Sequence, residues 1–177
     1  MKKFSILLSI ILLSFAVSCS KQAKEPQKVD NLYQKDSLSF TLPVSWLVKD
    51  DYVNRDGRFL ELDKYVDYKV KSTMAIGILF KKQPSDSILG NQLKQLASYY
   101  KEITFKVLEE NKTAKLGKFS ALLTTYMADD TQAKIYGRIF VIDEAKNPVY
   151  VQIVEDSQSP DNLDYDTIFN SIKFTKK

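Results

Sequence analysis

The stretch from residue 50 to residue 71, DDYVNRDGRFLELDKYVDYKVK, holds the densest mixture of carboxylates, arginines and tyrosines in the chain. Carboxylate oxygens are the ligands that calcium prefers, and Asn54-Arg55-Asp56-Gly57 matches the middle of an EF-hand loop. The match fails at the first loop position, which would be Tyr52, and the twelfth would be Asp63 in place of glutamate. A strand is also expected where the second EF-hand helix should begin. We therefore expect a solvated hairpin whose charges pair across strands, with no metal.

The same stretch contains side chains of the types that are enriched at protein interfaces. Tyrosine and arginine often dominate binding energy there, because they bury a large area and keep a polar group. The candidate interaction surface consists of Tyr52, Arg55, Arg58, Tyr65 and Tyr68. Strand alternation offers another interpretation, in which some of these tyrosines are simply half-buried strand residues.

Two pairs of adjacent carboxylates, Asp129-Asp130 and Asp143-Glu144, are the minimum for acid–base catalysis. Both pairs lie at predicted turns, where aspartate is favoured because its side chain bonds to the nearby backbone. Adjacent residues of a strand also point to opposite faces, so neither pair converges naturally on one substrate. The pattern favours turn residues over a catalytic pair.

The only cysteine, Cys19, follows a leader-like segment. Two lysines precede an apolar run over residues 6–15, and Ala16-Val17-Ser18 places small side chains directly before the cysteine. This order is typical of a secretory signal peptide, and the run is too short to span a membrane as a helix. It resembles the bacterial lipobox, in which the cysteine is diacylated and becomes the new N-terminus. We predict a lipoprotein held at the extracytoplasmic side of a bacterial envelope membrane by acylated Cys19; the alternative is a plain secreted protein.

Histidine is absent from the whole sequence. Its absence removes the usual near-neutral general base and the commonest metal ligand. Ser-His-Asp catalysis, Cys-His catalysis and zinc sites that need histidine are therefore excluded. We predict that the protein is not an enzyme and has no catalytic residues and no cofactor. The alternative is an envelope hydrolase that uses carboxylate and lysine groups in a cleft of a sheet.

Composition divides the chain into three segments. Residues 1–18 are the predicted signal peptide, and residues 19–36 are polar, contain Pro26 and predict a flexible stalk. Residues 37–177 are predicted to form one domain. Loss of the signal peptide takes two lysines from the 26 basic residues, which leaves 24 against 22 acidic residues and a net charge of +2. The charges are interspersed without a basic face, which argues against a nucleic-acid partner.

Apolar periodicity predicts an antiparallel sheet of about six to seven strands with two amphipathic helices packed on it, an α+β fold. Residues 38–42 alternate as a half-buried strand does, and Asp56-Gly57 predicts a hairpin because both residues tolerate positive φ. Residues 73–80 are apolar on both faces, and the smaller face, with Ala75 and Gly77, is predicted to lie beneath a helix.

Two helices are expected from apolar stripes at helical spacing. The first spans 87–103 with Asp86 as its N-cap, and its stripe consists of Leu89, Leu93, Leu96, Tyr100 and Ile103. The second is capped by Asp161 or Asp164, and its stripe consists of Tyr165, Ile168, Phe169 and Ile172.

Two short segments resemble the PsbP-like family, which includes photosystem extrinsic subunits and bacterial envelope proteins of the DcrB type. Phe40-Thr41-Leu42-Pro43-Val44-Ser45-Trp46 is similar to the family's opening strand, proline and tryptophan, and Phe169-Asn170-Ser171-Ile172-Lys173-Phe174 is similar to its closing helix and tail. The resemblance covers about residues 38 to 175. It implies an α-β-α sandwich around an antiparallel sheet. We expect Trp46 and Phe174 in the core, because large aromatic side chains dominate packing.

The family's members are mostly non-enzymatic accessory, assembly or binding proteins. Together with the predicted anchor, the resemblance implies a lipid-anchored envelope protein with a non-catalytic binding, accessory or assembly role. Its expected partners are membrane lipid through acylated Cys19, and an envelope protein or a small ligand.

Overall fold

The computed structural model describes residues 32–36, 38–129, 133–142, 147–156 and 163–174, all within the compact unit Asn31–Lys177. The predicted signal peptide and Cys19 lie outside the described residues. The elements of the described part are β1 (Leu32–Lys35), β2 (Leu38–Thr41), β3 (Trp46–Val53), β4 (Gly57–Val66), β5 (Lys69–Leu79), α2 (Ser85–Tyr99), β6 (Thr104–Leu116), β7 (Phe119–Asp129), β8 (Lys134–Ile142), β9 (Val149–Glu155), α3 (Leu163–Ser171) and β10 (Lys173–Phe174).

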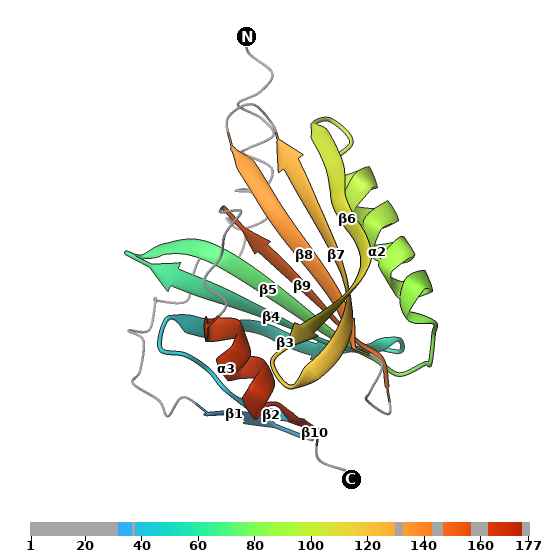
Figure 1. The fold of residues 1–177 in the computed structure, drawn as a ribbon. Coiled ribbons are helices and arrows are strands. Elements are labelled where there is room, and N and C mark those ends of the chain that lie inside the picture. The colour runs from blue at the N-terminus through green and yellow to red at the C-terminus, as the bar shows by residue number, and fades with distance from the viewer. Residues whose placement is uncertain (1–31, 37, 130–132, 143–146, 157–162, 175–177) are drawn as a thin grey trace. The chain divides into compact units, whose positions relative to one another are not determined.

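The strands form two antiparallel sheets (Figure 1). The main sheet has seven strands in the order β3-β4-β5-β9-β8-β7-β6, and the small sheet has the order β1-β2-β10. The predicted α+β class, a mainly antiparallel sheet with two helices, is confirmed. The strand at 38–41, however, belongs to the small sheet, where it pairs with β1. The chain turns after it at Pro43, whose carbonyl oxygen accepts a hydrogen bond from the Trp46 amide at 2.9 Å.

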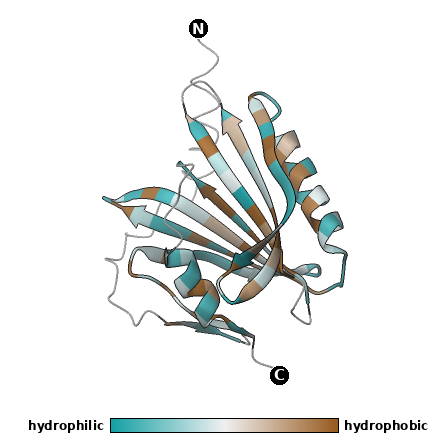
Figure 2. Ribbon diagram, in the orientation of Figure 1, coloured by the Kyte–Doolittle hydropathy of each residue, from teal (hydrophilic) through white to brown (hydrophobic). Residues whose placement is uncertain are grey.

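Alternation along the strands gives the main sheet two different faces. In β8, Phe140 and Ile142 belong to a core cluster with α3 and β2, whereas Ile139 and Val141 belong to a second cluster with α2. The two helices therefore lie on opposite faces of the main sheet. Figure 2 shows the hydrophobic residues recurring along the strands that carry both clusters.

Helix α2 begins two residues before the predicted start and ends earlier, at Tyr99. Asp86 lies in the first turn and is not the cap: its side chain accepts from the Ser87 amide at 2.8 Å, and the N-cap residue is Pro84. The helix packs against β7 and β8. The predicted helix cover over Ala75 and Gly77 is therefore wrong.

The folded unit begins earlier than predicted, because Leu32–Lys35 of the predicted stalk form β1 and pair with β2. Tyr33 stacks on Phe40 with ring centroids 4.8 Å apart. The other residues of β1 are exposed, which is why its composition resembles that of a linker. The stalk prediction is thus wrong for residues 32–35.

Trp46 is a core residue, as predicted. Its indole Nε1 donates to Asp164 Oδ2 at 3.0 Å, and its ring meets Tyr165 edge to face. Asp164 lies in the first turn of α3. The alternative cap, Asp161, lies outside the described residues, as does the side chain of Phe174.

Candidate functional site

The five residues of the predicted interaction surface do not form one patch. Tyr52 and Arg58 lie near one hairpin but on opposite faces of the main sheet. Tyr52 pairs with Phe59, and Arg58 is the residue directly before Phe59 in β4, so its side chain points to the other face. Arg55 is exposed at that hairpin. The remaining two lie at the far end of β4, where Tyr65 is 38% and Tyr68 is 102% exposed. Tyr68 follows Asp67 in a turn in which both residues have positive φ, 50° and 61°.

Arg58 is a buried structural residue and offers no surface for a partner. Its Nε and Nη2 atoms donate to the two oxygens of Asp51 at 2.9 and 2.8 Å, and Nη1 donates to the Lys35 carbonyl oxygen at 3.1 Å. The Tyr33 hydroxyl donates to the same carboxylate. The bidentate ion pair therefore joins β3 to β4, and the contacts of Arg58 with Lys35 and of Asp51 with Tyr33 tie β1 to the main sheet.

The hairpin at Asp56-Gly57 forms as predicted, but for another reason. Neither residue has positive φ. The Asn54 side chain accepts from the Asp56 and Gly57 amides at 2.8 and 3.1 Å, which makes the turn. A Cβ on Gly57 would lie 2.6 Å from the Ile78 carbonyl oxygen, so glycine is needed there for close approach to β5.

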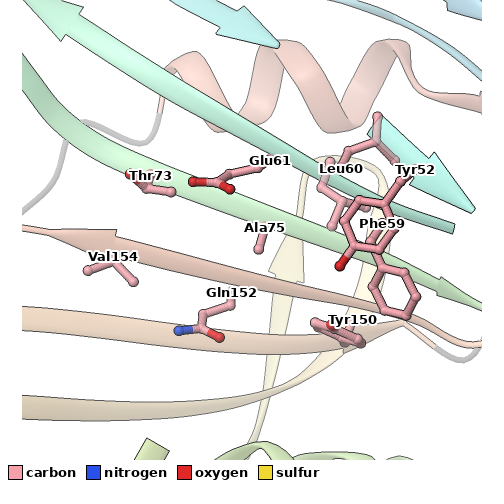
Figure 3. A pocket seen from close by; sticks show the side chains of 10 residues that line it. Tyr52, Phe59, Leu60, Glu61, Thr73, Ala75, Tyr150, Gln152 and Val154 are labelled. Carbon is pink, nitrogen blue, oxygen red and sulfur yellow. The ribbon is translucent and has the colours of Figure 1, made fainter. Parts of the chain in front are cut away.

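A pocket of about 250 Å³ lies on the part of the sheet that α2 leaves open. We call it the open-face pocket; it is lined by Tyr52, Phe59, Leu60, Glu61, Thr73, Ala75, Ile76, Tyr150, Gln152 and Val154. Figure 3 shows the aromatic side chains gathered at one end and Glu61 and Thr73 toward the other. The pocket is therefore aromatic at one end and polar at the other.

Strand register explains how residues distant in sequence meet in this pocket. One row across the sheet runs from Tyr52 to Phe59, Gly77 and Tyr150, and the next row contains Glu61, Ala75 and Gln152. Ala75 forms a low floor between two longer side chains. The hollow thus results from one small residue in an interior strand.

The aromatic end is built around Gly77. The Tyr52 and Phe59 rings are stacked at 5.4 Å, and Phe59 faces Tyr150 at 6.4 Å with a tilt of 53°. A Cβ on Gly77 would lie within 3.0 Å of the Tyr150 ring, so that ring covers the glycine directly. Burial raises the pKa of the Tyr150 hydroxyl, which keeps it neutral.

The polar end is organised by a β-bulge in β3. The register shifts between Val48 and Asp50, and the extra residue, Lys49, reaches Glu61 Oε1 at 2.6 Å and Asp63 Oδ2 at 3.8 Å. Burial alone would lower the pKa of the Lys49 ammonium, but the hydrogen bond to Glu61 and the charge of Asp63 raise it above its ordinary value. Lys49 therefore stays protonated and is a poor base or nucleophile.

The remaining polar lining residues are also held in place. Thr73 donates to the buried Asp63 carboxylate at 2.7 Å, and Gln152 Nε2 donates to the Tyr126 hydroxyl at 3.0 Å. Among the residues that the structure describes, no group of three or more histidine, cysteine, aspartate or glutamate side chains is placed to hold a metal ion. The geometry suits recognition of a ligand by shape, charge and hydrogen bonds.

Of the two carboxylate pairs predicted from sequence, the structure describes one residue, Asp129. Asp129 pairs with Lys134 at 3.4 Å beside the β7–β8 connection. Its neighbour Asp130, and the pair Asp143-Glu144, lie outside the described residues. No helix in the described part of the chain is long and apolar enough to cross a membrane.

The fold belongs to the class of antiparallel sheets with one helix on each face. A scan against models of protein families and a search of curated proteins return no match. A crystal structure of a protein from Bacteroides thetaiotaomicron VPI-5482 is similar, with a TM-score of 0.52 and 8% sequence identity. The likeness covers 84% of this chain and 49% of the other, so the chain spans about half the length of that protein. At this identity the likeness concerns the fold alone, and the resemblance to the PsbP-like family stays a prediction.

Proposed function

We propose that this protein is a lipid-anchored, non-catalytic binding module of the bacterial envelope, and that it binds a small ligand in the open-face pocket. The observation that carries the proposal is the pocket itself. It lies on the seven-stranded sheet, and the small side chain of Ala75 leaves it hollow where α2 does not cover the face. Ligand sites commonly combine such an aromatic wall with a few fixed polar groups.

The charged groups beside the pocket favour binding over hydrolysis. A general base or nucleophile must have a pKa near the working pH and a free lone pair. Lys49 is protonated and held by Glu61, and Asp63 is buried between Lys49 and Thr73. These contacts favour a binding role over the alternative hydrolase.

Filling the pocket tests the proposed function. We expect Ala75→Phe to abolish binding, because the new ring occupies the space above the floor. Ligand-observed NMR with a library of small metabolites detects binding to wild type and variant. Changes in the protein's amide shifts at Tyr150, Gln152 and Val154 then show which hits bind in the pocket. Ser120→Phe adds the same ring at an exposed position of β7 and should leave binding unchanged. A library without any hit at these amides, or hits that survive Ala75→Phe, would contradict the proposal.

The anchor has a separate test. If Cys19 carries the lipid, mass spectrometry of the membrane fraction should show diacylglyceryl Cys19, and Cys19→Ala should move the protein to the soluble fraction. Ser20→Ala changes the neighbouring residue and should leave the protein in the membrane fraction. An unmodified Cys19, or a variant that stays in the membrane, would overturn the anchor.

A further inference from the structure

We infer that the open-face pocket takes a small organic cation, a ligand with an ammonium group on a compact body. The inference rests on the proposed function and names the chemistry of its ligand. It is carried by two independent features of the pocket, the charge of its polar end and the three rings of its aromatic end.

The charges at the polar end favour a cation. Among the described residues of the lining, Glu61 is the one of a charged type, and none is a lysine or an arginine. Asp50 pairs with Glu61 across β3 and β4, and Asp63 lies one row further along the same face. Lys49 is the one ammonium among these three carboxylates, which leaves two negative charges. A site with this balance attracts a positively charged ligand and repels an anion.

The next lysine along the same face does not change this balance. Lys71 lies two residues from Thr73 on β5, and its ammonium pairs with Asp156 Oδ2 at 3.0 Å. This ion pair is neutral as a unit. The excess of negative charge therefore stays at the pocket.

The aromatic end supplies the second attraction. The faces of aromatic rings carry partial negative charge, and an ammonium group within about 6 Å of a ring centroid is attracted to them. Tyr52, Phe59 and Tyr150 come from β3, β4 and β9 and line one end of the pocket. Glu61 lies one row away. An ammonium group between them would interact with both a carboxylate and the ring faces.

Hydrogen-bond acceptors and size limit the ligand further. Glu61 offers a second carboxylate oxygen beyond the one that Lys49 contacts, and Gln152 offers its amide oxygen. Both accept from N–H or O–H donors of a ligand. At about 250 Å³ the pocket lies just below the range of about 300–1,000 Å³ that is usual for ligand pockets. The ligand is therefore a small molecule or the cationic end of a longer one.

A matched pair of probes tests the charge directly. Choline carries a quaternary ammonium, and 3,3-dimethyl-1-butanol has the same shape without the charge. We expect NMR titration to show choline at the amides of Tyr150 and Gln152 with an affinity at least about fivefold above that of the uncharged isostere. Added salt should reduce the difference.

Two variants with matched controls assign the difference to the pocket. Glu61→Gln should reduce the preference for choline over the isostere to what the aromatic rings alone supply, whereas Asp67→Asn removes the same charge from the distant turn and should change nothing. Tyr52→Leu should weaken choline binding, whereas Tyr99→Leu at an exposed site on α2 should not. Circular dichroism confirms that each variant is folded.

The outcomes separate this inference from the proposed function. Equal affinity of the wild type for the two probes overturns the inference of a cationic ligand. So does a Glu61→Gln variant in which the affinities for choline and for the isostere change by the same factor. A metabolite library that yields only neutral or anionic ligands at the pocket overturns the cation while the binding function stands. A library that yields no pocket ligand of any charge overturns both.

Discussion

We expect Gly137→Ala to lower the free energy of unfolding by about 3 kcal/mol or more, which would be among the largest effects of any single methyl group in this chain. A Cβ at this position would lie under 3.0 Å from two ring carbons and the hydroxyl oxygen of Tyr126. That ring cannot move away, because it is fully buried beside Phe105 and its hydroxyl accepts from Gln152. Chemical denaturation measures the loss.

Gly90→Ala provides the matched control for this substitution. Gly90 lies in α2, and a Cβ there would meet nothing within 4 Å. Alanine should therefore stabilise the helix by about 0.5–1 kcal/mol. The double variant Gly137→Ala with Tyr126→Ala should cost less than the sum of its parts, since the clash is gone. A Gly137→Ala protein as stable as wild type would contradict this account of the β7–β8 pair.

The two tyrosine–glycine pairs show what sequence reasoning could and could not find. Gly77 and Gly137 stand in strands, where a glycine often marks a bulge or the close approach of another element. Each instead lies directly opposite a tyrosine, Tyr150 and Tyr126, in the neighbouring strand. Which residue lies opposite each glycine depends on the register between its strand and the neighbouring strand. That register cannot be deduced from composition.

The elements themselves were largely predictable because their signals are local. Period-two alternation located β2 and β9, and the stripe of leucines located α2 to within a few residues at each end. What the stripe could not show is which strands the helix would cover. Because α2 packs on β7 and β8, Ala75 stays uncovered and becomes the pocket floor.

The prediction that Arg58 lies on an interaction surface is wrong for a related reason. Residue types enriched at interfaces also make good buried networks, and only contacts separate the two roles. Arg58 has the right type, but Asp51 and Tyr33 hold it in the interior. Tyr33, which contacts Arg58 from β1, belongs to a segment whose polar composition predicts a linker.

Arg58→Met should cost about 3–5 kcal/mol of unfolding free energy, because it leaves the Asp51 carboxylate buried without its counter-charge. Asp51 is 7% exposed, and its remaining contacts come from Tyr33 and the exposed Lys35. Arg55→Met, at a side chain that is 93% exposed, removes the same charge from the nearby hairpin and should change stability by less than about 0.5 kcal/mol. Thermal and chemical denaturation measure both.

The double variant Arg58→Met with Asp51→Leu shows whether the cost comes from the unpaired charge. Replacing both partners by apolar side chains removes that charge, so we expect it to recover most of the lost stability. An Arg58→Met protein that is as stable as wild type, or a double variant worse than both single variants combined, would contradict the structural role of the pair.

The pH dependence gives the same ion pair an independent signature. The hydrogen bonds from Arg58 hold the pKa of the Asp51 carboxyl well below its ordinary value of 3.8. A depressed pKa in the folded state means that the stabilisation is complete above pH 3.8 and is lost as the pH falls below it. Wild type should therefore lose stability steeply with acid in this range, and Asp51→Asn should lose it less steeply. Parallel acid-denaturation curves for the two proteins would show that the pair does not stabilise the charged carboxylate.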